Sequence, residues 1–330
     1  MKHGGDLSDA IAQYGGGPPA WLDLSTGINP CPWPVPAILA AEVWQRLPSR
    51  ADHEALIAAA RAAYHVPAHA DIVAAPGTQG LIQWLPHLAP PGAVAVVGPT
   101  YSEHAIAWRA AGRDVIDVDS IEAAVARAPH VVVVNPNNPD GRIIDHPSVM
   151  QAARAVQRNG GWLVIDEAFV DTSPRSSAVA LCGDDPIVIL RSFGKFYGLA
   201  GIRLGFAIAA PSVTKTIAAA LGPWSCSGPA LAIGTAALRD HEWAEQTRGD
   251  LREMAQAMDR VLTRGGLELI DGTALFRLAR HHDAAVVHAR LARQHIWCRR
   301  FDHADDLLRF GLPPDMAALD RLAAALGSDA

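Results

Sequence analysis

Several features that would indicate other classes of protein are scarce or missing in this sequence. The four cysteines lie far apart and form no CxxC pair, so they provide neither a zinc ligand set nor a disulfide framework, and we expect reduced thiols and no metal. The net charge of −6 argues against nucleic acid or an anionic membrane as the main partner. No apolar run approaches the roughly 20 residues of a membrane span, and residues 1–17 lack the apolar segment of a secretion signal. We therefore expect a soluble, cytoplasmic protein with a small-molecule ligand.

Lysine is also rare. Only three of the 28 basic residues are lysine, namely Lys2, Lys195 and Lys215, so the sequence fills its generic cationic positions with arginine. A lysine kept against this bias is a candidate for what arginine cannot do, which is to lose its proton and attack a carbonyl. Lys2 lies in a terminal tail and Lys215 in a predicted surface helix, whereas Lys195 has apolar and aromatic neighbours. The bias therefore singles out Lys195.

Length and composition predict two domains. A chain of 330 residues, half of them apolar, can bury a large core and exceeds the usual size of one domain. Residues 1–45, rich in glycine and proline, are predicted to form an N-terminal arm and part of a small domain. We expect residues 46–222 to form a large domain and residues 223–330 to complete the small one.

Short β-rich runs alternate with amphipathic segments over residues 71–210 and predict an α/β fold. Near-continuous apolar runs such as Val131–Val134 indicate strands buried on both faces, hence a mostly parallel sheet wrapped by helices. Sites in such sheets lie at the carboxyl ends of the strands. In the smaller α+β domain we expect one long helix over residues 229–264. Strands are predicted at residues 71–75, 93–98, 114–118, 130–135, 162–166, 187–190 and 204–209, and in the small domain at 267–270, 275–278 and 307–310.

The segment Ser192–Gly198, SFGKFYG, carries the strongest chemical signal. It places Lys195 just after a predicted buried strand, with Ser192 three residues before it and Arg203 eight residues after it. A lysine there can form a Schiff base with an aldehyde, while the serine and the arginine hold a phosphate. The alternative is an ordinary lysine in a surface loop.

Two further predicted strands end in polar residues suited to a ligand. Residues 130–139 read HVVVVNPNNP, a buried strand followed by a turn in which Asn138 can present its amide to a ligand oxygen. Residues 162–169 read WLVIDEAF and place Asp166 at the carboxyl edge of the sheet. A carboxylate there needs a partner, and a protonated pyridine nitrogen would provide one. A helix cap or a structural ion pair is the alternative for Asp166.

A glycine-containing turn precedes these segments in the chain. After the strand that ends near Ala75 comes Pro76-Gly77-Thr78-Gln79-Gly80 and then an amphipathic helix. The free backbone amides at the start of a helix suit an anion. Such turns are common, so this one gains its weight from being the first of four ordered segments.

The order of these segments, GTQG, NPNNP, DEA and SxxK with a following arginine, resembles the class I aminotransferase superfamily of fold-type I pyridoxal 5′-phosphate (PLP) enzymes over residues 70–210. By this resemblance the large domain would bind PLP, with Lys195 as the Schiff-base lysine, Asp166 at the ring nitrogen and Asn138 at the ring hydroxyl. The cofactor phosphate would be held by Gly77, Thr78, Gln79, Ser192 and Arg203. The resemblance also implies a homodimer with its sites near the interface.

A finer resemblance, spanning most of the chain, is to the threonine-phosphate decarboxylases of cobalamin biosynthesis. It rests on His3-Gly4-Gly5, Leu24–Pro30 (LSTGINP), Phe169-Val170-Asp171 and Pro223-Trp224-Ser225. It implies decarboxylation of L-threonine O-3-phosphate to 1-aminopropan-2-ol O-phosphate, with Lys195 and Asp166 as catalytic residues. Histidinol-phosphate aminotransferase, or another small amino-acid aminotransferase, is the alternative enzyme because the cofactor motifs are shared. A non-catalytic PLP-binding protein is the alternative from another class.

Three positions depart from the superfamily pattern. The aromatic residue that stacks on the cofactor ring aligns with His104, and Tyr101 is the alternative. Phe169 stands where aminotransferases commonly have a tyrosine, so a donor to the ring oxygen is missing, which favours the decarboxylase. The tyrosine that many relatives send across the dimer interface is replaced near Leu47.

The substrate-binding residues are expected near the two ends of the chain. Arg309, within LLRFGLP, matches the carboxylate-binding arginine of the superfamily, and Arg299 is a second candidate for an anionic group. His3 in the N-terminal arm and Asn29 in LSTGINP are further candidates. Which arginine would hold the carboxylate and which the phosphate stays open, and a surface location is the alternative for both.

Overall fold

The computed structural model describes residues 4–35, 40–183 and 186–327, and the chain divides into two compact units. The large unit consists of Pro32–Asn138 and Arg142–Ala244, and the small unit of the chain up to Cys31, Pro139–Gly141 and the chain from Glu245 onward. These boundaries differ from the predicted limits at residues 45 and 222. The large unit extends beyond residue 222 because helix α10 (Gly228–Arg239) packs against its helix α3 (Arg50–Ala63).

A seven-stranded sheet runs through the large unit in the order β2-β8-β7-β6-β5-β3-β4. Neighbouring strands are parallel except around β8, which is antiparallel to both β2 and β7. The predicted α/β class with a mostly parallel sheet is thus confirmed. The strands are β2 (Asp71–Ala75), β3 (Val94–Val97), β4 (Val115–Val118), β5 (His130–Val134), β6 (Leu163–Asp166), β7 (Ile187–Ser192) and β8 (Gly205–Ala209).

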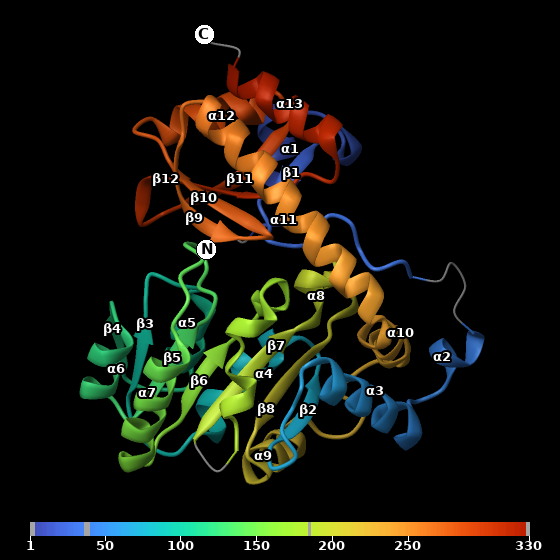
Figure 1. Ribbon diagram of the computed structural model, residues 1–330, viewed down its shortest axis with the longest axis vertical. Coiled ribbons are helices and arrows are strands. Elements are labelled where there is room, and N and C mark those ends of the chain that lie inside the picture. Colours follow the sequence, from blue (N-terminus) through green and yellow to red (C-terminus); the bar gives the residue numbers. More distant parts are fainter. Residues whose placement is uncertain (1–3, 36–39, 184–185, 328–330) are drawn as a thin grey trace. The chain divides into compact units, whose positions relative to one another are not determined.

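Helices cover both faces of this sheet (Figure 1). Helices α4 (Thr78–Leu88), α5 (Glu103–Ala110) and α9 (Pro211–Leu221) share one core with Val96, Val164 and Val188 of the strands. All residues of β3, β5, β6, β7 and β8 are buried, as expected for strands covered on both faces. The unit also contains α2 (Ala41–Gln45), α6 (Ile121–Arg127), α7 (His146–Arg158) and α8 (Phe193–Phe196).

The small unit has a five-stranded sheet in the order β1-β11-β12-β10-β9. Strand β1 (Leu22–Leu24) is parallel to β11 (Ile296–Phe301), so both ends of the chain contribute to one sheet. The remaining strands are β9 (Glu268–Thr273), β10 (Phe276–Arg280) and β12 (Ala304–Gly311), joined in antiparallel pairs. The helices of this unit are α1 (Ser8–Tyr14), α12 (Ala284–Arg293), α13 (Met316–Gly327) and most of α11 (His241–Arg264).

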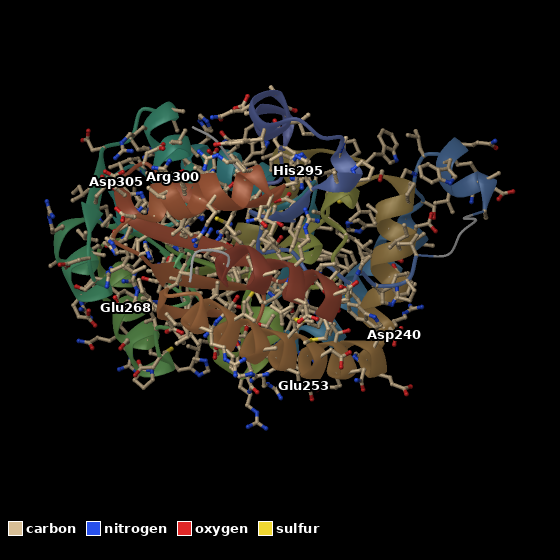
Figure 2. All side chains as sticks on the ribbon, turned by 90° about the horizontal axis from the view of Figure 1, so that it is seen from above. Asp240, Glu253, Glu268, His295, Arg300 and Asp305 are labelled. Carbon is tan, nitrogen blue, oxygen red and sulfur yellow. The ribbon has the colours of Figure 1, made fainter. Side chains whose placement is uncertain are left out.

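The chain over residues 229–264 forms two helices, α10 and α11, instead of the one predicted. They meet at Asp240, whose carboxylate accepts the N–H of Trp243 (3.1 Å) and so caps the first turn of α11 (Figure 2). The same carboxylate accepts the indole N–H of Trp33 (3.0 Å), which fixes the junction. Among the described residues, none of these helices is both long and apolar enough to cross a membrane.

Candidate active site

The predicted cofactor residues gather at one edge of the large sheet, because most of them follow strands that run in the same direction. The edge carries Gly77 after β2, Asn138 after β5, Asp166 at the end of β6 and Ser192 at the end of β7. Arg203 instead precedes a strand, β8. Because β8 runs antiparallel, its first residue, Gly205, pairs with both Ala75 and Ser192. The reversed strand therefore brings Arg203 to the edge that the other residues occupy.

Gly77 and Arg203 form an anion cradle at the start of α4. Gly77 has a φ of 79° and caps the helix, whose first N–H groups have no partner within it. A Cβ on Gly77 would lie 2.8 Å from an Nη atom of Arg203, so the guanidinium lies against the bare glycine. Arg203 has a left-handed backbone (φ 54°), which costs about 1 kcal/mol for a residue other than glycine. A helix start and a guanidinium together suit a phosphate.

The side chain of Gln79 is hydrogen-bonded to the start of α5. Its Nε2 donates to Glu103 Oε2 (3.0 Å), and its Oε1 accepts from the Tyr101 hydroxyl (3.3 Å). Burial, helped by nearby carboxylates, raises the pKa of Tyr101 to about 12, so the phenol stays a donor at neutral pH. The sequence predicts a phosphate contact for Gln79, and these bonds leave its backbone N–H in the first turn of α4 for that role.

Asp166 and His104 form a buried pair. They are 3% and 1% exposed, and His104 Nε2 lies 2.9 Å from Asp166 Oδ2. The other oxygen, Oδ1, accepts the N–H of Ala168 (3.0 Å). The sequence predicts that His104 stacks on the cofactor ring, and in the structure its ring nitrogen contacts the carboxylate predicted to pair with the cofactor. Stacking by His104 or Tyr101 stays a prediction.

Lys195 lies in helix α8, directly after Ser192 ends β7. Its Nζ is 5.7 Å from the centre of the Phe169 ring, which follows the neighbouring strand β6. Phe169 is buried and has no polar side-chain atom. Beyond the lysine, the ring of Tyr197 stacks on Phe193 with 4.4 Å between ring centres, and this stack anchors α8. The structure therefore places the amine of Lys195 near an apolar ring, in the short helix that follows Ser192.

The three asparagines after β5 have different surroundings. Asn135 exchanges two hydrogen bonds with the backbone of Ile144 (2.8 and 3.3 Å). Asn137 donates to the carbonyl of Pro99 (3.0 Å) and accepts from the hydroxyl of Thr100 (2.6 Å). Both are buried and hold the turn, whereas Asn138 is half-buried. Asn138 therefore stays the candidate for contact with a ligand oxygen.

A buried ion network lies next to Asp166 and Ser192 in the chain, and the sequence did not reveal it. Arg191 pairs with Asp171 and with Glu167 (3.3 Å), and its guanidinium lies 4.1 Å from the centre of the Tyr64 ring. Burial lowers the pKa of Arg191, but the two carboxylates outweigh burial and the net shift is upward. We call these three charged residues the Arg191 network.

Further hydrogen bonds complete the Arg191 network. Glu167 accepts from the hydroxyl of Ser177 (2.7 Å) and from the N–H of Ala178 (2.6 Å). Glu167 directly follows Asp166, and Arg191 directly precedes Ser192. The network therefore ties the end of β6 to the end of β7, where the candidate cofactor residues lie. The sequence feature that could have indicated this network is the single arginine, Arg191, in the apolar run IVILRS.

In the small unit, Arg299 and Arg309 occupy opposite positions on β11 and β12, and such pairs lie on one face of a sheet. Arg309 is buried, and its Nη2 donates to the carbonyl of Ser25 (2.8 Å). Burial, with the charge of Arg299, lowers the pKa of Arg309 to about 10, so it stays protonated at neutral pH. Two neighbouring guanidinium groups suit an anionic ligand. The next residue, Arg300, is exposed, as is Asp305 across the β11–β12 turn (Figure 2).

Residues from the N-terminal region lie beside Arg309. The N–H of Gly5 donates to Ser25 Oγ (2.9 Å), so the arm lies on the segment that contacts the arginine. A Cβ on Gly311 would lie 2.0 Å from the carbonyl oxygen of Thr26, which shows how closely LSTGINP follows β12.

The other two candidate substrate residues are less defined by their contacts. Asn29 is buried, and its Oδ1 accepts the N–H of Cys31 (2.9 Å), a bond that shapes the turn. His3 lies outside the described residues. No group of three or more His, Cys, Asp or Glu side chains in the described part of the chain is placed to hold a metal ion.

The residues of the large unit fit PLP by their own chemistry. The anion cradle suits the phosphate, the buried carboxylate of Asp166 suits a protonated ring nitrogen, and the amine of Lys195 suits the aldehyde. These groups at the edge of a mostly parallel sheet define a fold-type I PLP-dependent enzyme. The chain belongs to the aminotransferase class I and II family, whose model matches residues 23–326.

Comparison with known proteins narrows the relationship. The chain is 44% identical to a threonine-phosphate decarboxylase of Sinorhizobium sp over 328 residues, 99% of this chain and 97% of that protein. It is 40% identical to a threonine-phosphate decarboxylase of Pseudomonas aeruginosa, with the same coverage. A crystal structure of histidinol-phosphate aminotransferase from Sinorhizobium meliloti in complex with PLP superposes with a TM-score of 0.82, at 23% identity and over 98% of this chain and 94% of that one. The predicted fold type and cofactor are thus confirmed.

Proposed function

We propose that this protein decarboxylates L-threonine O-3-phosphate to (R)-1-aminopropan-2-ol O-2-phosphate for cobalamin (vitamin B12) biosynthesis, with PLP as cofactor. The observation that carries the proposal is the identity of 44% and 40% to two threonine-phosphate decarboxylases along 99% of the chain. The cofactor motifs are shared with aminotransferases and do not separate the two activities. The match along nearly the whole chain extends beyond these motifs to the segment LSTGINP, in which the carbonyl of Ser25 accepts a hydrogen bond from Arg309.

The residues of the large unit bind and orient the cofactor in this proposal. Lys195 attaches it covalently, Asp166 keeps a proton on its ring nitrogen, and Asn138 contacts its ring hydroxyl. The phosphate is held by Gly77, Thr78, Gln79, Ser192 and Arg203. When bound, PLP supplies an electron sink for the bond that breaks at Cα. That bond joins Cα to the carboxylate. Once the substrate amine has displaced Lys195 from the cofactor, the freed Nζ would hold a proton and, after carbon dioxide leaves, donate it to Cα. Lys195 would then displace the product amine and take back the cofactor.

The residues of the small unit bind the substrate. L-threonine O-3-phosphate carries a carboxylate and a phosphate, and the chain provides two guanidinium groups, on Arg299 and Arg309, at opposite strand positions. The planar fork of arginine binds either group through two hydrogen bonds. Asn29 and His3 are the further candidates at this site. Contacts with the phosphate lower the barrier of the chemical step only to the extent that they are stronger in the transition state than in the bound substrate.

The decisive experiment supplies L-threonine O-3-phosphate without any keto acid. A decarboxylase releases carbon dioxide and aminopropanol phosphate over many turnovers, whereas a transaminase stops after one half-reaction with the cofactor converted to pyridoxamine phosphate. Unphosphorylated threonine should be a far poorer substrate. Turnover of histidinol phosphate with 2-oxoglutarate, and none of threonine phosphate, would replace the decarboxylase by the aminotransferase alternative.

Variants on one strand test the substrate site. Arg299→Gln should raise KM for threonine phosphate by about tenfold or more, because a charge-assisted hydrogen bond contributes about 1.5–3 kcal/mol. Arg300→Gln is the matched control, since Arg300 is the next residue of β11 and is exposed. An equal response of both variants would remove Arg299 from the site.

We also infer a homodimer and a cytoplasmic location. The resemblance to the superfamily supports the homodimer, and Trp44 and Leu47 of the α2 region offer apolar surface, at 67% and 66% exposure. Light scattering of the purified protein measures the mass directly, and a monomer at micromolar concentration would contradict the first inference. The four cysteines are free thiols, as is usual in the reducing cytoplasm, and this supports the cytoplasmic location.

A further inference from the structure

Helix α8, which carries Lys195, is too short to hold its own position. It comprises Phe193–Phe196, and a helix of about one turn is unstable in water without tertiary contacts. Its first residue is tied to the sheet, because the N–H of Phe193 donates to the carbonyl of Leu204 just before β8 (3.3 Å). The position of Lys195 therefore also depends on what holds the other end of the helix.

The other end is held at Tyr197, a buried residue that directly follows α8. The ring of Tyr197 stacks on the ring of Trp243, in the first turn of α11, with 5.5 Å between ring centres and an interplanar angle of 15°. It also stacks on the ring of Phe193, with 4.4 Å and 8°. The carbonyl of Tyr197 accepts the backbone N–H of Trp33 (2.9 Å). Both the ring and the backbone of this residue are thus held by distant parts of the chain.

Asp240 joins the two tryptophans that hold Tyr197. Its Oδ2 accepts the indole N–H of Trp33 (3.0 Å), and its Oδ1 accepts the backbone N–H of Trp243 (3.1 Å). We call Trp33, Tyr197, Asp240 and Trp243 the Tyr197 clasp. The contacts of the clasp close on themselves, because each of the four residues is held by two of the others. All four belong to the large unit.

The clasp lies at two of the points where the chain passes from one unit to the other. The chain enters the large unit at Pro32, directly before Trp33, and leaves it after Ala244, which directly follows Trp243. The roles proposed above for the cofactor and the substrate use none of these residues. The clasp therefore fixes the helix of Lys195 to two of the segments that connect the units along the chain.

We propose that the Tyr197 clasp positions Lys195: it holds the end of α8 so that Nζ meets the aldehyde of PLP in the geometry that formation of the Schiff base requires. In this step the lone pair of the neutral amine attacks the aldehyde carbon. A C=N bond replaces the C=O bond, and the aldehyde oxygen leaves as water with the two protons of the amine. A misplacement of about 1 Å in such a step can cost about a hundredfold in rate. The inference rests on the proposed role of Lys195.

Substitutions of Trp243 open the clasp without changing α8. Trp243→Leu removes the ring that stacks on Tyr197, whereas Trp243→Phe keeps a ring there. Trp84→Leu is the matched control, because Trp84 is a tryptophan of the large unit, 43% exposed, whose ring lies against His87 of its own helix α4. Thermal unfolding of each apoprotein shows whether the variant folds.

Two probes separate the position of Lys195 from the rest of the cofactor site. Each apoprotein is mixed rapidly with saturating PLP, and the visible absorbance of the Schiff base gives the rate at which it forms. Pyridoxamine 5′-phosphate has the ring and the phosphate of the cofactor but no aldehyde. Its dissociation constant, measured by its own fluorescence, therefore reports binding without any reaction of Lys195.

We expect Trp243→Leu to form the Schiff base at least about tenfold more slowly than the wild type, and to bind pyridoxamine phosphate within about threefold of it. Trp243→Phe and Trp84→Leu should stay within about threefold of the wild type in both measurements. A wild-type rate in Trp243→Leu overturns the proposal, as does an equal loss in Trp243→Phe or Trp84→Leu. A tenfold weaker binding of pyridoxamine phosphate by Trp243→Leu also overturns it, because the clasp would then support the whole site. If Trp243→Leu does not fold, Trp243→Met takes its place.

Borohydride reduction and substrate turnover separate this inference from the proposals around it. If reduction fixes PLP on a lysine other than Lys195, the proposed role of Lys195 fails and the inference fails with it. If PLP is fixed on Lys195 but L-threonine O-3-phosphate is not decarboxylated, the proposed function alone fails. The inference is then still decided by the rate of Schiff-base formation, because that assay contains no substrate.

Discussion

Replacing Arg191 with methionine should strongly destabilise the protein, because the carboxylates that Arg191 neutralises would stay buried. The side chains of Arg191, Glu167 and Asp171 are 3%, 0% and 6% exposed, so they cannot reach water without local unfolding. Removing one partner of a buried ion pair costs about 3–5 kcal/mol. Methionine is similar in length to the arginine stem, so little is added by loss of packing. We expect the free energy of unfolding to fall by about 4 kcal/mol at pH 8.

The pH dependence of this loss gives a second signature. Burial raises the pKa of Glu167, and the charge of Arg191 is the main opposing influence. Without Arg191 the carboxyl group should take up a proton more readily, and a neutral carboxyl group is less costly to bury. The loss relative to the wild type should therefore be smaller at pH 5.5 than at pH 8.

Urea denaturation of the apoprotein, followed by tryptophan fluorescence at both pH values, measures these differences. Arg50→Met is the matched control, because Arg50 pairs with Glu54 at 3.1 Å on the surface, where the two side chains are 90% and 62% exposed. Such exposed pairs contribute about 0.5 kcal/mol or less. A loss below about 1 kcal/mol for Arg191→Met, or a loss independent of pH, would refute the view that two ionised carboxylates depend on this arginine.

Three further predictions concern other residues. Borohydride reduction of the holoenzyme should fix PLP on Lys195, and Lys195→Ala should keep the fold and lose turnover; a peptide map with the label on Lys215 contradicts this. Phe169→Tyr should lower the pKa of the cofactor Schiff base in an absorbance titration, because a hydroxyl would stabilise the ring oxygen anion; an unchanged or raised value would place Phe169 away from that oxygen. Burial lowers the pKa of His288 from 6.5 to about 4. As the pH falls, this histidine therefore takes up a proton in the unfolded chain before it does so in the folded protein, and up to about 3 kcal/mol of stability is lost between pH 6.5 and 4. His288→Gln should flatten the change of the urea midpoint over this range, and an equally steep change in the variant would exclude His288 as the cause.

The cofactor side of the site could be predicted from the sequence because its residues follow strands directly. A parallel sheet gathers the carboxyl ends of its strands at one edge, so Gly77, Asp166 and Lys195 could be placed together from local patterns alone. Arg203 was predicted from its spacing after Lys195, but the sequence did not predict the reversed direction of β8, on which its position at this edge depends. That direction is a property of long-range pairing, which no local pattern in residues 204–209 reveals.

Strands β1 and β11 of the small unit, and the partners of several side chains, could not be predicted for a similar reason. Strand β1 has only three residues and pairs with β11, whose sequence IWCRRF contains two arginines that obscure its apolar alternation. An imidazole or an amide can bind a ligand or another side chain with equal ease. The sequence therefore placed His104 and Gln79 near the cofactor but did not reveal their bonds to Asp166 and Glu103.

The position of Arg203 so close to Lys195 along the chain bears on how the cofactor is released. Under the proposed roles, the covalent hold at Lys195 and the phosphate contacts of Ser192 and Arg203 all belong to one short stretch from the last residue of β7 to the start of β8. Local opening of this stretch would loosen the phosphate contacts and admit water to the Schiff base at Lys195, whose hydrolysis would free the cofactor while the buried strands stay folded. Cofactor exchange and hydrogen exchange of the amides at residues 193–204 should then report the same opening, so bound PLP would slow amide exchange there far more than in the core of the sheet.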